Sequence, residues 1–189
     1  MRKSFLILLF STSIFADWET KVDGVVNLVF GSKVNVVFGQ VWPGARIQVS
    51  HPLKWGVHYW AGADFFHVKG SILGLEKDTA LTYLPLGTGL RYQAAILPGV
   101  DIYLGGGPRL GALSIQNDIL KTRRMHRSFG WGMVGFTGLN LSFTENMNID
   151  LMSNVGSTTF QNTGLSGHIP YLDLKLGGYD FAVGLKLKF

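Results

Sequence analysis

The chain closes on YDFAVGLKLKF, residues 179–189, in which large apolar side chains alternate with small or charged ones. One parity holds Phe181, Val183, Leu185, Leu187 and Phe189, and the other holds Asp180, Ala182, Gly184, Lys186 and Lys188. Because successive side chains of a β-strand point to opposite faces, the stretch predicts a strand with one apolar and one polar face. The fold depends on what lies against each of these two faces.

Similar alternating segments recur along the chain and are separated by turn residues. The predicted strands run over residues 22–30, 45–50, 55–68, 79–95, 100–115, 128–143, 147–158 and 171–189. The predicted connections are short at 51–54, 97–99 and 144–146 and long elsewhere, including loops over 69–78 and 116–127. Short turns at one end and longer loops at the other are typical of outer-membrane barrels. We therefore expect an all-β, eight-stranded antiparallel up-and-down transmembrane barrel over residues 17–189, in which GGYD at 177–180 is either part of the last strand, as we prefer, or a separate hairpin.

The amino-terminal stretch MRKSFLILLFSTSIFA, residues 1–16, has the pattern of a secretory signal peptide. Arg2 and Lys3 precede a short apolar run, and Ala16 precedes the polar sequence DWET, so cleavage is expected after Ala16. Removing these two cations lowers the formal charge from +5 to +3, which does not favour a nucleic-acid partner. Charged residues make up only 15% of the chain, against about 25% in average domains.

The polar faces of the predicted strands contain a small set of charged residues that would point into the barrel. This predicted polar lumen consists of Arg46, Arg91, Asp101, Arg109, Asp150, Lys186 and Lys188. Its excess of cations leaves two interpretations open: a paired polar core that fixes the barrel, or a lining that favours anionic solutes. We prefer the paired core, because unpaired buried charge is costly and eight strands enclose little space beyond their own side chains.

Four blocks of sequence resemble one family of small outer-membrane barrels. YLPLGTGLRYQ, VDIYLGGGPRLGAL, FGWGMVGFTGLNLSF and the terminal FAVGLKLKF occur in the order typical of OmpW-like proteins, within the wider OmpA/OmpX type. The resemblance implies export to an outer membrane, contact with its lipids and lipopolysaccharide, and passage of small hydrophobic molecules as one role. It also implies a carboxy-terminal signal for the barrel-assembly machinery, formed by Tyr179, Phe181, Val183, Leu185, Leu187 and Phe189.

Catalytic and cofactor motifs are weak in this sequence. His126 and Ser128 resemble the His-x-Ser spacing of lipid A deacylases, but the next carboxylate, Glu145, follows 17 residues later and is out of reach along a strand. The remaining histidines show no metal-ligand spacing, and the chain has no cysteine. We therefore expect neither enzymatic activity nor a cofactor, with a lipid-modifying enzyme kept as one alternative.

A basic stretch between the fifth and sixth predicted strands contains Lys121, Arg123, Arg124 and Arg127. It is expected to be a solvated external loop, or one that contacts lipopolysaccharide phosphates, since Arg pairs well with phosphate. The function expected from the sequence is structural, adhesive or passively transporting. A soluble, lipocalin-like exported binder is the other alternative, and the oligomeric state is left open.

Overall fold

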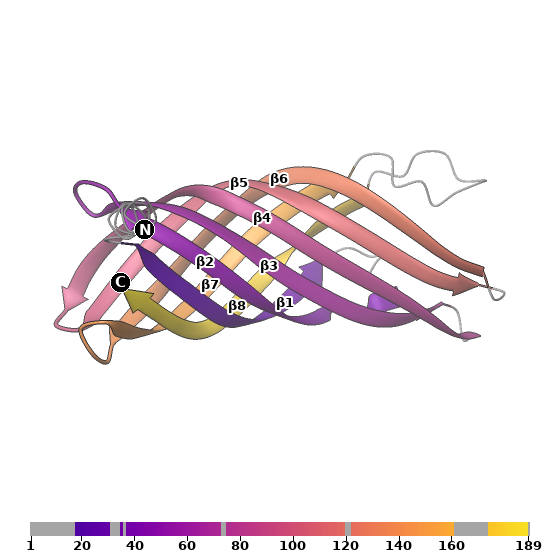
Figure 1. Cartoon of the computed structure of the whole chain (residues 1–189), viewed down its shortest axis with the longest axis horizontal. Coiled ribbons are helices and arrows are strands. Elements are labelled where there is room, and N and C mark those ends of the chain that lie inside the picture. Colours follow the sequence, from indigo (N-terminus) through magenta and orange to yellow (C-terminus); the bar gives the residue numbers. More distant parts are fainter. Residues whose placement is uncertain are drawn as a thin grey trace, which may run out of the picture.

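The fold is a single sheet of eight antiparallel strands that closes on itself (Figure 1). This computed structural model describes residues 18–30, 35, 37–72, 75–119, 122–160 and 174–188, with the backbone only at 71–72, 75–78, 117–119 and 122–126. The strands are β1 (Glu19–Phe30), β2 (Val41–Pro52), β3 (Val57–Ile72), β4 (Leu75–Leu97), β5 (Val100–Ile119), β6 (Thr122–Ser142), β7 (Met147–Phe160) and β8 (Leu174–Lys188). Each strand pairs with its sequence neighbours, and β1 pairs with β8 to close the barrel. The predicted fold class is confirmed.

The GGYD segment lies inside β8 and is not a hairpin. Gly178 pairs with Gly156 of β7 on one side and with Val29 of β1 on the other. The register therefore continues without a break through the last strand. This arrangement settles the strand count at eight and brings both ends of the described chain to the same end of the barrel (Figure 1).

Two of the predicted long loops are wrong. β3 continues to Ile72 and β4 begins at Leu75, while β5 continues to Ile119 and β6 begins at Thr122. Arg123 pairs with Asp118, so Arg123, Arg124 and Arg127 lie in a strand and not in a loop. These segments look like loops in the sequence because their apolar alternation stops. Backbone pairing to a neighbouring strand does not require that alternation, so the hairpins continue as paired sheet.

The barrel wall is uneven in height. β3 to β6 contain 16, 23, 20 and 21 residues, whereas β1, β2, β7 and β8 contain 12, 12, 14 and 15. The connections at 53–56, 98–99 and 143–146 lie at the end that carries both termini of the described chain. The β3–β4 and β5–β6 hairpins project from the opposite end, at the right of Figure 1. We refer to this projecting part as the β3–β6 wall.

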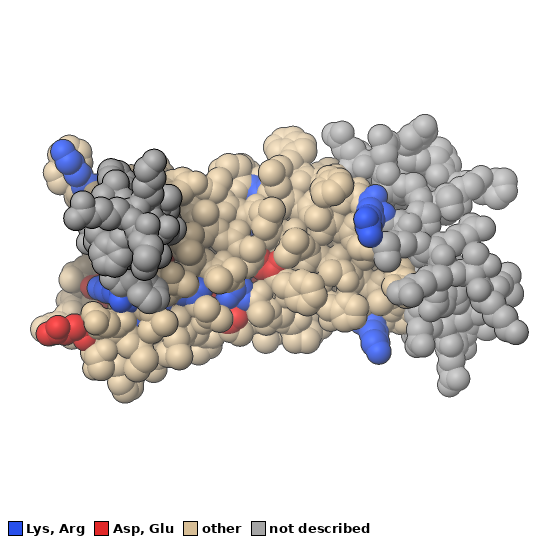
Figure 2. Space-filling view, in the orientation of Figure 1, with Lys and Arg blue, Asp and Glu red and all other residues tan. Residues whose placement is uncertain are grey.

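The outer surface of the barrel is apolar and its interior is charged. Large exposed side chains on the strands include Val22, Ile47, Phe65, Leu86, Leu104, Trp131, Leu151 and Val183. Most of the flank in Figure 2 is uncharged, and prominent Lys and Arg side chains project near its two ends. Among the described residues, no helix is long and apolar enough to cross a membrane. An apolar exterior around a charged interior is the reverse of a soluble lipocalin-like binder and suits a lipid-facing barrel wall.

Candidate functional site

The charged interior of the barrel is the candidate functional site, and its first layer lies near the end that carries the termini. Arg91 donates a hydrogen bond from Nη2 to Glu19 Oε2 at 2.9 Å, and Lys186 Nζ lies 2.8 Å from the same oxygen. Ser50 Oγ donates to Glu19 Oε2 at 3.1 Å. Alternation brings these residues together from β1, β2, β4 and β8, because each stands on the inward parity of its strand. One carboxylate therefore holds two buried cations.

A second layer is centred on Lys21, whose side chain is buried. Its Nζ forms an ion pair with Asp150 Oδ2 and lies 3.3 Å from Asp23 Oδ2. Tyr103 donates from its hydroxyl to Asp150 Oδ2 at 2.9 Å, and the Lys21 ammonium lies 5.6 Å from the centre of the Tyr103 ring. The layer joins β1, β5 and β7 across the interior, so it ties together strands that do not pair with one another.

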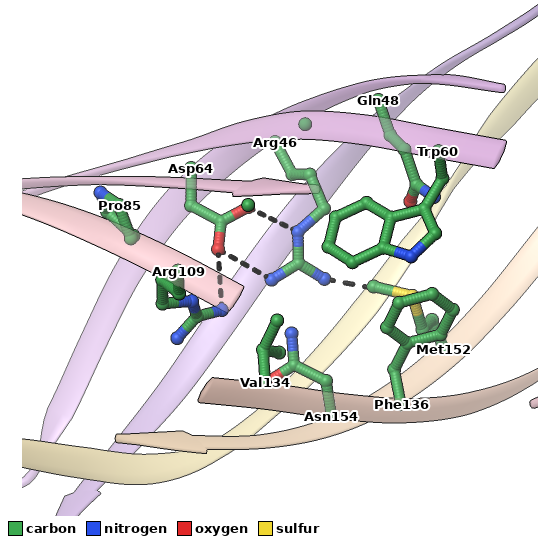
Figure 3. A pocket seen from close by; sticks show the side chains of 12 residues that line it. Arg46, Gln48, Trp60, Asp64, Pro85, Arg109, Val134, Phe136, Met152 and Asn154 are labelled. Atoms are coloured by element: carbon green, nitrogen blue, oxygen red, sulfur yellow. Dashed lines mark hydrogen bonds and ion pairs between the residues drawn. The ribbon is translucent and has the colours of Figure 1, made fainter. Parts of the chain in front are cut away.

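A third layer consists of two arginines and two aspartates, of which Figure 3 shows Arg46, Arg109 and Asp64. Arg46 pairs with Asp64 through Nε and donates from Nη2 to Asp64 Oδ2 at 2.9 Å and to Asp180 Oδ2 at 3.1 Å. Arg109 donates from Nη2 to Asp64 Oδ2 at 3.3 Å and lies 3.9 Å from Asp180 Oδ2. The bidentate pairing of Arg46 with Asp64 gives this layer a defined geometry.

A fourth layer is aromatic and lies on the side of the β3–β6 wall. Phe66 stacks on Tyr83 at a centroid distance of 6.1 Å, and Phe160 meets Tyr83 edge-on at 5.9 Å. The Tyr83 hydroxyl satisfies its polar end by a hydrogen bond of 2.7 Å to Thr158 Oγ1. Trp42 is completely buried in the same apolar cluster. These rings form an apolar plug above the charged layers.

The four layers leave little free space inside the barrel. One cavity of about 20 Å³ lies beside Arg46, Trp60 and Arg109, and another of about 10 Å³ lies beside Asn27 and Tyr83. Volumes of this size hold about one water molecule each. A larger hollow of about 470 Å³ lies against β5 to β8, and its lining includes the outward-facing side chains of Ile102, Leu151 and Val183. Each of these two interior cavities therefore has room for about one water molecule and not for a larger solute.

The buried charges are balanced, which overturns the predicted excess of cations. Among the described residues, five Lys or Arg side chains and five carboxylates are buried: Lys21, Arg46, Arg91, Arg109, Lys186, Glu19, Asp23, Asp64, Asp150 and Asp180. This balance favours the paired core over a lining that favours anionic solutes. Five of these ten residues, Arg46, Arg91, Arg109, Asp150 and Lys186, belong to the predicted polar lumen.

Two predicted lumen residues lie elsewhere, and five buried charges were missing from the prediction. Lys188 is exposed because β8 ends there, beyond the filled interior, and Asp101 is half-buried, where it accepts a hydrogen bond of 2.8 Å from Gln93 Nε2. The prediction lacked Glu19, Lys21, Asp23, Asp64 and Asp180. Glu19 and Lys21 precede the predicted start of the first strand. Asp23, Asp64 and Asp180 lie within predicted strands, and their positions on the polar face could have identified them. Asp180, for example, has the same parity as Lys186 and therefore points to the same side of the strand.

The remaining predicted site residues lie on the outside of the barrel or beyond the described residues. The predicted assembly set on β8 faces outward, with 41–59% of each side chain exposed: Tyr179, Phe181, Val183, Leu185 and Leu187. Phe189 and Lys121 lie outside the described residues, and Arg127 is exposed on β6. Glu145 lies in the turn that follows β6, at the opposite end of the barrel from His126. Within the described part of the chain, no cluster of three His, Asp or Glu residues could hold a metal ion.

Comparison with solved structures identifies the same architecture in small outer-membrane proteins. The chain superimposes on Neisserial surface protein A with a TM-score of 0.58 and 15% identity, over 92% of this chain and 98% of that chain. It superimposes on the outer-membrane protein OprG from Pseudomonas aeruginosa with a TM-score of 0.57 and 11% identity, over 92% and 96%. The attachment invasion locus protein Ail of Yersinia pestis gives a TM-score of 0.51 and 12% identity, over 91% and 99%. No family model matches the sequence, and no curated protein matches it. At these identities the likeness shows the fold, that of a small eight-stranded outer-membrane barrel.

Proposed function

We propose that the protein is an integral outer-membrane barrel with a closed interior, and that it displays the β3–β6 wall outside the cell in a structural or adhesive role. The single observation that carries this proposal is the filled interior. Three layers of paired charges and one layer of aromatic rings follow one another along the barrel, and the free volumes between them are about 20 Å³ and 10 Å³. A protein of this kind acts through its surfaces and not through a pore.

The proposed orientation of the barrel in the membrane follows from the difference between its two ends, one with short turns and the other with long hairpins. Outer-membrane barrels have short periplasmic turns, and the turns at 53–56, 98–99 and 143–146 share one end with the termini. That end is placed in the periplasm, where an exported chain with a cleaved leader at residues 1–16 would begin. The β3–β6 wall then extends beyond the outer surface of the membrane. Its 16 to 23-residue strands exceed the roughly 9–11 residues that a bilayer requires.

The experiment that tests the closed interior measures conductance in planar bilayers and swelling of liposomes that contain the refolded protein. We expect no stable conductance step and no swelling in small sugars, with the folded barrel confirmed by its heat-dependent gel mobility. A general porin reconstituted in parallel supplies the positive control. Regular conductance steps from the folded protein would overturn the proposal of a closed barrel.

Lipids of the outer membrane are the proposed surroundings, and lipopolysaccharide is the proposed partner at the external rim. Trp131 is exposed, and the register places it beside Thr159 and then Lys175 on neighbouring strands. Lys69 and Arg127 are exposed on the β3–β6 wall. An aromatic rim followed by cations suits the boundary between acyl chains and phosphorylated head groups. Replacing Lys69, Arg127 and Lys175 by Ser should weaken retention of lipopolysaccharide during purification, and unchanged retention would contradict this partner.

Passage of small hydrophobic molecules is a second candidate, favoured by the apolar fourth layer on the external side. A hydrophobic molecule could enter only by displacing rings such as Phe66 and Phe160. Replacing both residues by Ala should then speed uptake of a hydrophobic dye into vesicles. Equal uptake rates for wild type and variant would contradict passage through the barrel and favour the structural role.

The assembly machinery is the proposed partner of the carboxy-terminal strand, as in proteins that this chain resembles. Replacing Phe189 by Ala should lower the amount of folded barrel in the outer membrane without changing synthesis. Unchanged amounts of folded barrel would contradict a role for Phe189 in assembly. Phe181→Ala, on the same strand, would show whether the outward apolar residues support that signal.

A further inference from the structure

Three buried polar atoms beside the third charged layer have no hydrogen-bond partner among the described residues. They are Gln48 Nε2, Trp60 Nε1 and Asn154 Oδ1, and each of these residues is only 4–5% exposed. Burying a polar group without a hydrogen bond is costly, so such groups in folded proteins almost always have a partner. The three atoms therefore point to a ligand that is not part of the chain.

The side chains of these three residues line the same cavity (Figure 3). It is the cavity of about 20 Å³ beside Arg46 and Arg109. Gln48 and Trp60 stand on β2 and β3, whereas Asn154 stands on β7, which pairs with neither of them. Each residue that lines the cavity is described and lies within a paired strand, so the walls of the cavity are defined by the sheet itself.

The charges around the cavity disfavour an ion as its ligand. Arg46 and Arg109 are paired there with Asp64 and Asp180, so the third layer is already balanced. An added ion would bring an unpaired charge into a buried layer, which is very costly. The ligand is therefore expected to be neutral.

The three polar atoms select a neutral ligand that both accepts and donates hydrogen bonds. Gln48 and Trp60 offer N–H donors, and Asn154 offers an acceptor oxygen. A water molecule in a protein interior needs roughly 2–4 polar partners, and the three atoms meet that need. The volume of about 20 Å³ admits about one water molecule and excludes a larger molecule.

We propose that this cavity is a binding site for one structural water molecule. The water accepts hydrogen bonds from the side chains of Gln48 and Trp60 and donates one to Asn154. It joins β2 and β3 to β7 across the interior, and so adds a bridge between strands that do not pair. The inference goes beyond the proposed function, since it does not depend on which end of the barrel faces the cell exterior.

The test measures magnetisation transfer from water to the indole proton of Trp60, by nuclear magnetic resonance of the nitrogen-15-labelled protein in deuterated detergent micelles. We expect Overhauser effects of opposite sign in the laboratory and rotating frames, which is the signature of a long-lived bound water. Trp42 is the internal control, because its indole N–H donates to the carbonyl oxygen of Gly39 at 3.1 Å and should show no transfer. Absence of transfer at Trp60 in the folded protein would overturn the proposal. Effects of equal sign, as for bulk solvent, would indicate an open lumen and would also overturn it.

Matched variants separate a bound water from a nearby hydroxyl proton. Asn154→Leu replaces the acceptor by methyl groups and should abolish the transfer, and Gln48→Met removes one donor and should weaken it. Gln40→Met changes the same kind of side chain at an exposed position and should leave the transfer unchanged.

Heat-dependent gel mobility identifies the variants that fold, and Gln48→Met decides alone if Asn154→Leu does not fold. Unchanged transfer in folded Gln48→Met would assign the signal to a hydroxyl group and would overturn the water site. A shift of the Trp60 indole resonance on addition of sodium chloride would identify a bound ion and would overturn it as well.

Discussion

The third charged layer gives the sharpest stability test, through replacement of Asp64 by Asn. Asp64 is 5% exposed and accepts hydrogen bonds from both Arg46 and Arg109. The isosteric amide removes one negative charge and leaves two buried cations facing Asp180 alone. Breaking a buried ion pair from one side typically costs about 3–5 kcal/mol. We expect the free energy of unfolding to fall by an amount in that range.

A second substitution decides whether charge balance is the cause. In the double variant Asp64→Asn/Arg109→Gln, Arg46 remains paired with Asp180, at 3.1 Å between Nη2 and Oδ2. The double variant should be more stable than Asp64→Asn by about 1 kcal/mol or more, because the surplus cation is gone. Asp101→Asn is the control. Asp101 is a half-buried carboxylate with one hydrogen bond to Gln93, so this variant should lower the free energy of unfolding by about 1 kcal/mol or less.

The assay is urea unfolding of the protein in phospholipid vesicles, followed by the fluorescence of its five tryptophans. Reversible transitions of wild type and the three variants give the free energies directly. A loss below about 1 kcal/mol for Asp64→Asn would refute the claim that paired charges hold the interior together. A double variant less stable than the single variant would refute the explanation by charge balance.

Two further substitutions test the packing of the interior. Gly138→Ala places a Cβ against the Tyr103 ring and should lower the free energy of unfolding by about 1–3 kcal/mol. Gly135→Ala, on the same strand, has its nearest neighbouring atom 3.9 Å away and should be neutral or stabilising by up to about 1 kcal/mol. Equal losses of stability in the same urea assay would contradict the assignment of inward and outward faces on β6. Tyr83→Phe removes the 2.7 Å hydrogen bond to buried Thr158 and should cost about 1–3 kcal/mol, and an unchanged unfolding midpoint would show that this bond adds nothing to the plug.

Alternation was sufficient to predict the barrel and half of its buried charges. Each strand carries large apolar residues on one parity, so the outward face could be assigned from sequence, as for Phe181 and Val183 on β8. The same parity placed Arg91, Arg109 and Lys186 inside. These features are local, and a period of two residues is sufficient to specify them.

Alternation does not predict which buried charges pair with one another, nor how far the β3–β4 and β5–β6 hairpins extend beyond the barrel. Lys21 meets Asp150 across the barrel, 129 positions away, and that contact depends on the closure of the sheet and on its register. The projecting hairpins were predicted as loops because the segment around Arg123 has lost the apolar alternation that marks a strand in a membrane. Its pairing with Asp118 comes from the continued hydrogen bonding of two neighbouring backbones.

The most direct test of the account is the side of the membrane on which each end of the barrel lies. The chain has no cysteine, so single cysteines can be introduced at Lys69, on the β3–β6 wall, and at Glu145, in the turn near the termini. An impermeant maleimide applied to intact cells should label the cysteine at 69 and should reach the one at 145 only after the outer membrane is opened. Labelling of both positions in intact cells, or of 145 alone, would contradict a membrane-spanning barrel that displays the β3–β6 wall outside.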